Sequence, residues 1–225
     1  MKLDNNQQAF FALVRAGLWE TEVKLTQFDQ IDFNQVHRLA EEQSVVGLVV
    51  AGIEHVIDIK VPQATALTFV GDALQLEQRN KVMNSYISKL MDELRKQDIY
   101  SILIKGQGIA QCYERPFWRA AGDIDLLLDN HNYEKAKQKL IPKAENVETE
   151  YSYFKHLGMS IDGWEVELHG TFQSRLSKRV DNVIDAIQDR IFELGEISEK
   201  STIKGSAVLT VLTVLNGPVQ RMYFS

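Results

Sequence analysis

Cysteine is nearly missing from this sequence, since Cys112 is the one thiol among 225 residues. A single cysteine excludes a disulfide within the chain and a zinc site built from several cysteines. The surrounding residues 108–114 have a helical pattern, so we expect Cys112 to be a buried structural thiol.

Long apolar runs are also missing. No stretch approaches the eighteen or so consecutive apolar residues that a membrane-spanning helix needs. The first residues contain no long apolar region behind a basic start, so they do not read as a signal peptide. We therefore expect a cytoplasmic protein without a membrane partner.

The sequence has no excess of basic residues. It contains 25 Lys and Arg residues and 31 Asp and Glu residues, which gives a net charge of −6 and a pI of about 5.4. This balance argues against a broad surface for nucleic acid, although it is compatible with a local basic pocket for a nucleotide. A content of 44% hydrophobic and 25% charged residues is typical of a globular protein with one large domain or two small ones.

The first hundred residues have helical periodicity. Residues 5–19 read as a helix capped by Asp4 or Asn5, and residues 32–55 read as one or two helices in which glycines allow close packing or a break. Pro62 suits the start of a long helix that runs to about residue 97. We expect this helix to pack through an apolar stripe of Leu67, Leu74, Met83, Ile87, Leu90, Met91 and Leu94.

After residue 98 the pattern changes to short strands between helices. We expect strands at 99–106, 123–129, 151–160 and 164–169, with a DG turn at 162 and 163, and helices at 107–114, 130–141 and 177–194. Asp129 or Asn130 should cap the second of these helices. The apolar stretch 207–215 reads as either a strand or a helix.

These patterns predict an α+β fold. A helical N-terminal region, residues 1–97, precedes a small mixed β-sheet core flanked by helices, residues 98–195. Residues 196–225 form a C-terminal segment that we expect to be truncated or altered.

Two aspartates lie at the start of the predicted strand 123–129. Because side chains alternate along a strand, Ile124, Leu126 and Leu128 share one face while Asp123 and Asp125 share the other. Carboxylates two residues apart, roughly 6–7 Å along a strand, can converge on one divalent ion.

A second acidic pattern lies on the predicted strand 164–169. Glu165, Glu167 and His169 share one face there, and either glutamate can reach the aspartates if the two strands are neighbours. Three carboxylates around Mg²⁺ (or Mn²⁺) form the kind of site that nucleotidyl transfer needs. His169 has a structural role or acts as a ligand or base, whereas we expect His37, His55, His131 and His156 to be scattered surface residues.

The segment before the aspartates suits an anion. A strand that ends in Lys105 and Gly106 and opens a short helix presents backbone N–H groups, and the glycines at 106, 108 and 122 allow close approach. Lys105 and Arg119 offer positive charge to a phosphate.

Together, residues 103–129 and 164–170 resemble a family of uncharacterised bacterial nucleotidyltransferases within the DNA polymerase β-like superfamily. The resemblance implies transfer of a nucleoside monophosphate from an NTP such as ATP. It implies that Asp123 and Asp125 bind the metal with Glu167 as third carboxylate, and that Gly106 matches the first glycine of a Gly-Ser turn. Gln107 stands where that turn has serine, and its amide can still donate a hydrogen bond.

Other functions remain open. The D-x-D pair also occurs in glycosyltransferases that use nucleotide sugars, and more distantly in dehalogenase-type phosphatases. A different class is a non-catalytic nucleotide-binding or regulatory module that acts on a protein partner. The sequence specifies neither the preferred base nor the acceptor, which can be a protein, an antibiotic, a sugar or a nucleic acid.

Overall fold

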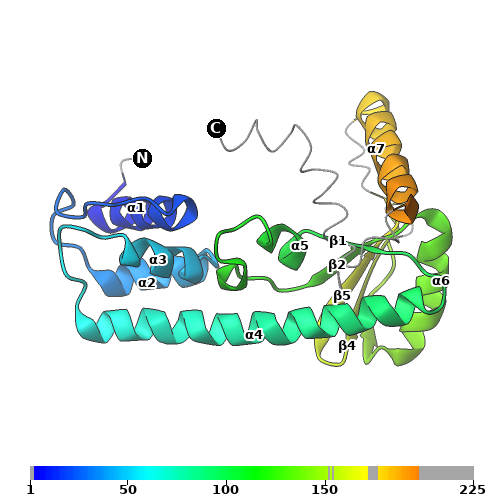
Figure 1. The fold of residues 1–225 in the computed structure, drawn as a ribbon, viewed down its shortest axis with the longest axis horizontal. Helices are drawn as coiled ribbons and strands as arrows, with labels where there is room; N and C mark the ends of the chain where they lie inside the picture. The colour runs from blue at the N-terminus through cyan, green and yellow to red at the C-terminus, as the bar shows by residue number, and fades with distance from the viewer. Residues whose placement is uncertain (1–2, 152, 154, 172–176, 198–225) are drawn as a thin grey trace. The chain divides into compact units, whose positions relative to one another are not determined.

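The computed structural model describes residues 3–151, 153, 155–171 and 177–197 (Figure 1). Within these residues the chain forms two compact units. One contains the residues up to Asn84 together with Ile109–Ala121, and the other contains Ser85–Gly108 and the described residues from Gly122 onward. The predicted domain boundaries at 97/98 and 195/196 stay predictions.

The first unit is helical. Its helices are α1 (Asn5–Trp19), α2 (Phe33–Glu42), α3 (Val46–Glu54) and the first part of α4 (Gln63–Arg95), followed by the 3₁₀ helix η1 (Pro116–Trp118). Asp4 caps α1 because its carboxylate accepts the Gln7 N–H at 2.8 Å, while the Gln7 side chain accepts the Asp4 N–H. Asp4 is therefore the cap, and the segment 32–55 contains two helices.

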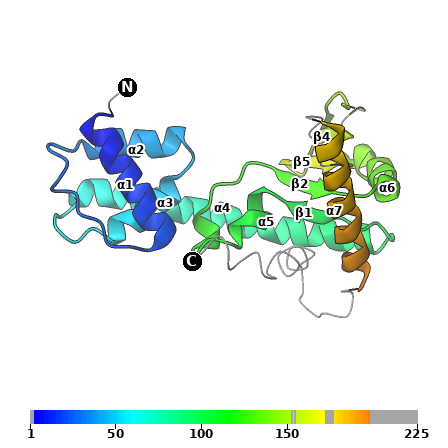
Figure 2. The ribbon, with the colours of Figure 1, turned by 90° about the horizontal axis from the view of Figure 1, so that it is seen from above.

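Helices α1 and α3 approach each other closely, and Figure 2 shows them side by side with α2. A Cβ atom built at Gly17 would lie 1.9 Å from the Leu48 carbonyl oxygen, and one at Gly52 would lie 2.1 Å from the Leu13 carbonyl oxygen. Only glycine permits such backbone contact. The predicted close packing at Gly52 is confirmed, and α3 continues through it without a break.

The second unit contains a five-stranded sheet of order β1-β2-β5-β4-β3. Pairing is parallel between β2 and β5 and antiparallel elsewhere, so the predicted mixed sheet and α+β class are confirmed. The strands are β1 (Ile102–Ile104), β2 (Ile124–Leu127), β3 (Asn146–Val147), β4 (His156–Ile161) and β5 (Trp164–His169).

Helices surround this sheet. They are the last part of α4, α5 (Gly106–Ala110), which crosses the boundary between the units, α6 (Asn130–Leu140), the 3₁₀ helix η2 (Ile141–Lys143) and α7 (Lys178–Ile197). Asp129 caps α6 by accepting the Asn132 N–H at 2.8 Å. Tyr86 of α4 stacks on Trp164 of β5 with ring centroids 6.1 Å apart. No described helix has the length and apolar character needed to cross a membrane.

The hairpin of β4 and β5 forms as predicted. Asp162 and Gly163 have φ angles of +52° and +75°, which suits the type I′ turn expected of a DG pair. The first strand is shorter than predicted, since β4 begins at His156 and Tyr151 forms only an isolated bridge to it.

Two predictions about burial were wrong. Leu67 and Leu74 of α4 are 64% and 58% exposed, and Phe69 and Ala73 are the buried residues on this part of the helix. Cys112 is exposed rather than buried, because α5 ends at Ala110, before the thiol. The apolar stretch 207–215 lies outside the described residues.

Candidate active site

The three predicted carboxylates meet on the central strands of the sheet. Asp125 of β2 is paired in parallel register with Glu167 of β5, so their side chains lie on the same face. Asp123 immediately precedes β2. One oxygen from each of Asp123, Asp125 and Glu167 lies within 4.8 Å of the other two, which places them where one cation could be held.

Asp125 is the buried member of this group, with 1% of its side chain exposed. Lys105 donates a hydrogen bond to its Oδ1 at 2.6 Å, and His169 Nε2 lies 2.8 Å from the same oxygen. Burial alone would raise the pKa of Asp125, but the hydrogen bonds from His169 and Lys105 hold that pKa below its usual value. The buried carboxyl is therefore an anion.

The second oxygen of Asp125 has different surroundings. Oδ2 is buried and has no hydrogen-bond partner among the described residues. A buried carboxylate oxygen without a partner is costly, and a bound cation would satisfy it. The donor set of Asp123, Asp125 and Glu167 consists of carboxylate oxygens, which suits Mg²⁺ or Mn²⁺.

The two candidate glutamates of β5 have separate partners. Glu165 is exposed and accepts a hydrogen bond from Ser160 Oγ at 2.6 Å. Glu167 is 27% exposed and joins the aspartates, whereas Glu165 belongs to none of the possible metal-binding groups among the described residues.

Lys105 and Gly106 form a turn with unusual backbone conformation between β1 and α5. Their φ angles are +51° and +22°, in a region that non-glycine residues rarely adopt. The turn presents the Lys105 ammonium to Asp125, and burial lowers the lysine pKa less than the carboxylates of Asp125, Glu167 and Asp123 raise it. Both partners of the ion pair are therefore charged.

The other predicted nucleotide-binding residues have varied surroundings. Gln107 is buried, whereas Gly122 is exposed and faces open space. Gly108 packs closely on β1, since a Cβ atom there would lie 3.0 Å from the Leu103 carbonyl oxygen. The structure thus assigns Gly108 to packing rather than to phosphate approach.

Arg119 lies in the first unit, directly after η1. Its Nη1 donates to the Ala120 carbonyl at 3.2 Å, and its guanidinium lies 6.0 Å from the centre of the Tyr113 ring. Asn80 of α4, which is fully buried, donates to the carbonyls of Phe117 and Arg119 at 2.7 and 2.8 Å. Asn80 therefore fixes the backbone that carries Arg119, whose role at a phosphate stays a prediction.

His156 was wrongly expected to be a scattered surface residue. Its Nε2 lies 3.1 Å from Glu167 Oε2, and its ring centroid lies 4.9 Å from that of His169. The sequence contained a signal for this contact, because a two-residue turn at 162 and 163 pairs His156 with His169 across the hairpin.

His37 and His55 are also half-buried rather than freely exposed. Each has a ring nitrogen 2.6 Å from a carboxylate, that of Asp72 for His37 and that of Glu20 for His55. His131 is exposed, as expected.

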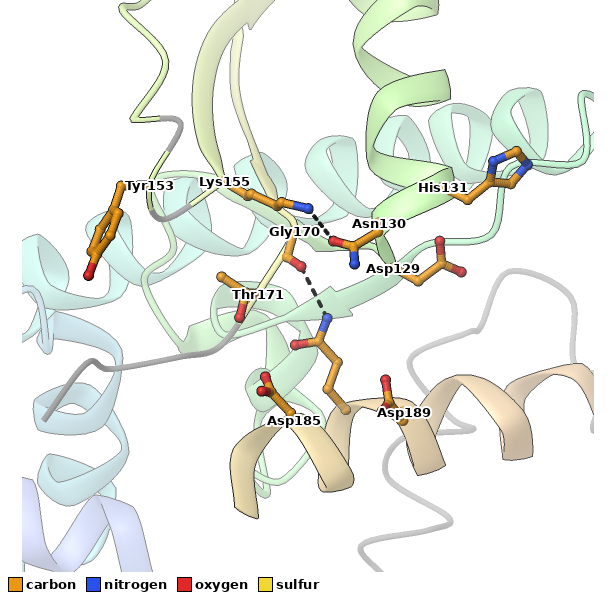
Figure 3. Close-up of a pocket in the computed structure, with 10 residues that line it drawn as sticks. Asp129, Asn130, His131, Tyr153, Lys155, Gly170, Thr171, Asp185 and Asp189 are labelled. Carbon is orange, nitrogen blue, oxygen red and sulfur yellow. Dashed lines mark hydrogen bonds between the residues drawn. The ribbon is translucent and has the colours of Figure 1, made fainter. Parts of the chain in front are cut away.

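A cavity of about 640 Å³ lies at the ends of β2 and β5 (Figure 3). Lys155 and Gly170, which adjoin His156 and His169 in the sequence, line it, as does Asp185 of α7. Gln188 of α7 donates to the Gly170 carbonyl at 3.2 Å and so ties α7 to the end of β5. The cavity is large enough for a small molecule, and none of the three carboxylates lines it.

Comparison with models of protein families gives a match for most of the chain. The family described as "Uncharacterised nucleotidyltransferase" matches residues 29–203, which is most of the chain. No curated protein and no solved structure matches the chain. The match covers the helical region from residue 29 onward and includes all three carboxylates, and it confirms the resemblance seen in the motifs. The chain therefore belongs to this family of uncharacterised nucleotidyltransferases.

Proposed function

We propose that this protein transfers a nucleoside monophosphate from an NTP to an acceptor hydroxyl and releases pyrophosphate, with Mg²⁺ or Mn²⁺ as cofactor. The observation that carries the proposal is the carboxylate group of Asp123, Asp125 and Glu167, which includes a buried oxygen without a partner among the described residues. Family membership supports the reaction class.

Each carboxylate has a role in this proposal. Asp123 and Asp125 would hold the divalent ion, and Glu167 would complete the ligand set and accept the proton of the attacking hydroxyl. When bound, the ion neutralises and orients the triphosphate and lowers the pKa of the hydroxyl.

The bond changes follow from nucleotidyl transfer. The acceptor oxygen forms a bond to the α-phosphorus, and the bond from that phosphorus to the oxygen bridging to the β-phosphate breaks. Pyrophosphate leaves with the electron pair, and the hydroxyl proton passes to Glu167.

The segment around the Lys105–Gly106 turn would bind the phosphates of the NTP. The Lys105 side chain is 55% exposed, so its ammonium is accessible to a phosphate while it also contacts Asp125. Backbone N–H groups at Gly106, the Gln107 amide and the open surface at Gly122 would contribute to binding.

The test is a transfer assay with labelled nucleotides. The chain is incubated with ATP, CTP, GTP and UTP labelled at the α-phosphate, with Mg²⁺ and with host-cell lysate. We expect label to move to a macromolecule or small molecule, with an equal amount of pyrophosphate released.

Two other outcomes separate the alternatives. Nucleotide binding with no pyrophosphate release from any acceptor would identify a non-catalytic module. Thermal stabilisation by UDP- or GDP-sugars but not by NTPs would identify a glycosyltransferase. Transfer at the wild-type rate by an Asp123→Asn variant would contradict the assigned site.

A further inference from the structure

Two histidines and one glutamate converge beside the carboxylate group. His156 Nε2 lies 3.1 Å from Glu167 Oε2, and His169 Nε2 lies 3.3 Å from the same oxygen. One ligand atom from each of the three residues lies within 4.8 Å of the other two. From this cluster we propose a second metal site, adjoining the carboxylate site, that takes a transition-metal ion of the zinc class.

The two distances to Glu167 suit tetrahedral coordination, and the two histidine nitrogens lie within 4.8 Å of each other. Zinc binds histidine nitrogen and carboxylate oxygen at roughly 2.0–2.2 Å, so neighbouring ligands on a tetrahedron lie about 3.3–3.5 Å apart. The two nitrogen-to-oxygen distances, 3.1 and 3.3 Å, need little adjustment to reach this spacing.

Ligand chemistry separates this site from the first. Imidazole nitrogen favours Zn²⁺, Co²⁺, Ni²⁺ or Cu²⁺, whereas a set of carboxylate oxygens favours Mg²⁺ or Mn²⁺. Glu167 belongs to both groups, so the two sites share one ligand.

Hydrogen bonding alone satisfies this cluster poorly. His169 Nε2 faces two carboxylate oxygens at once, Asp125 Oδ1 at 2.8 Å and Glu167 Oε2 at 3.3 Å, while Glu167 Oε2 also faces His156. One N–H makes one well-aligned hydrogen bond. A cation between the two imidazoles and the glutamate would serve all three groups.

The strand framework holds the ligands in place and leaves the site open. His156 and His169 are directly paired in the ladder of β4 and β5, and Glu167 lies two residues from His169 on the same face. The side chains of His156, Glu167 and His169 are 27%, 27% and 14% exposed, so an ion can enter from solvent. A three-ligand site keeps a position for water or for a substrate.

Co²⁺ is the probe, because its visible absorption reports tetrahedral coordination. The full chain without an affinity tag is titrated with Co²⁺ and then with competing Zn²⁺. We expect one Co²⁺ per chain with the strong absorption of a tetrahedral ion. In His156→Gln the affinity should fall by at least the roughly 10–100-fold that changes around metal ligands cost.

Two matched variants make the test specific. His131→Gln, at an exposed histidine outside the cluster, should leave the Co²⁺ spectrum unchanged. Asp123→Asn removes a carboxylate of the first site only, so it should also keep the spectrum while it loses Mn²⁺ binding. This outcome separates the second site from the proposed function, and it holds even for a chain that transfers no nucleotide.

A measurement on the wild-type chain covers the case in which His156→Gln does not fold. Zn²⁺ should protect His156 and His169, but not His131, from modification by diethylpyrocarbonate, as read by peptide mass spectrometry. Absence of tetrahedral Co²⁺ absorption would overturn the proposal. An unchanged spectrum in folded His156→Gln, or equal loss in Asp123→Asn, would overturn it too.

Discussion

At the residue scale, the surroundings of Asp125 differ between its two oxygens. Oδ1 accepts the Lys105 hydrogen bond and contacts His169, whereas Oδ2 has no partner among the described residues. The side chain is thus charged and fixed in position, with one oxygen still able to bind a cation. Such an arrangement is costly for folding alone, and buried groups of this kind concentrate at functional sites.

Replacing Asp125 by asparagine should abolish tight Mn²⁺ binding. The amide keeps the size of the side chain but carries no charge, so a buried ligand loses most of its attraction for the ion. The measurement is a titration followed by the electron paramagnetic resonance of free Mn²⁺. Glu165→Gln, at the exposed glutamate bonded to Ser160, is the control and should bind Mn²⁺ like the wild type. Equal binding by Asp125→Asn and the wild type would contradict this assignment.

Replacing Asn80 should lower the stability of the fold rather than affect metal binding. Its buried amide donates to the carbonyls of Phe117 and Arg119, so Asn80→Ala leaves both without these bonds. We expect the free energy of unfolding to fall by about 1–3 kcal/mol. Urea denaturation measures the change, and Gln78→Ala, at an exposed position of the same helix, should have little effect. A similar loss in both variants would show that helix content, not the Asn80 bonds, is responsible.

The residues of the candidate site were only partly predictable from sequence. Strand alternation placed Asp123 and Asp125 on the same face of one predicted strand, and Glu167 on the same face as Glu165 and His169 of another. This was predictable because alternation depends only on neighbouring residues in the sequence. The Lys105 ion pair was not predictable in this way, since it depends on β1 lying antiparallel to β2. His156 was missed although the DG turn fixes its partner, because a histidine alone carries no positional signal.

At the element scale, glycine sets the distance between α1 and α3. Gly17→Ala would place a methyl group 1.9 Å from the Leu48 carbonyl oxygen, whereas a Cβ atom at Gly71 of α4 meets nothing within 4 Å. We expect Gly17→Ala to lower the free energy of unfolding by about 3 kcal/mol or more, since neither backbone can yield easily. Gly71→Ala should raise it by about 0.5–1 kcal/mol through better helix propensity. Thermal or urea unfolding of the two variants measures these changes. Equal effects of Gly17→Ala and Gly71→Ala would contradict the close contact between Gly17 and the Leu48 carbonyl.

Asp58 ties the segment after α3 to the segment after α1. Its carboxylate accepts hydrogen bonds from the N–H groups of Leu25 and Thr26 and from the Thr26 hydroxyl. Partial burial alone would raise the pKa of Asp58, but these bonds lower it to about 2.

A lowered folded-state pKa means that Asp58 stabilises the fold above its ordinary pKa of 3.8 and loses this effect as the pH falls through about 2. Asp58→Asn removes the charge and keeps the shape. The difference in Tm between wild type and Asp58→Asn should therefore be largest at pH 5 and shrink steadily below pH 4. A difference that stays constant with pH would show that the charge contributes nothing.

Caps, periodicity and turn residues in the sequence predicted the helices and strands well. They predicted less well which side chains of these elements are buried. The capped helix α1, the long helix α4 and the hairpin of β4 and β5 all follow from caps, periodicity and turn residues. Leu67 and Leu74 are exposed, because an apolar residue is buried only if a tertiary partner covers it. β3, with two exposed residues, carries no periodic pattern to detect.

At the scale of the whole molecule, the chain combines a helical unit with a sheet unit that carries the carboxylates. The sequence predicted this order of helices before strands, and the family match extends across both. The sequence did not predict that residues 109–121 belong with the helical unit. That assignment depends on contacts between distant residues, such as the hydrogen bond from Trp118 to Glu77.

The most direct test of the central claim is Mg²⁺-dependent NTP binding measured by isothermal titration calorimetry. The wild type is compared with the double variant Asp123→Asn, Asp125→Asn, and circular dichroism verifies the fold. We expect the wild type to bind an NTP in the presence of Mg²⁺ and to bind it far more weakly with EDTA. The double variant should keep its fold and lose the Mg²⁺-dependent part. Unchanged Mg²⁺-dependent binding in the folded double variant would contradict the claim that these carboxylates form the nucleotidyl-transfer site.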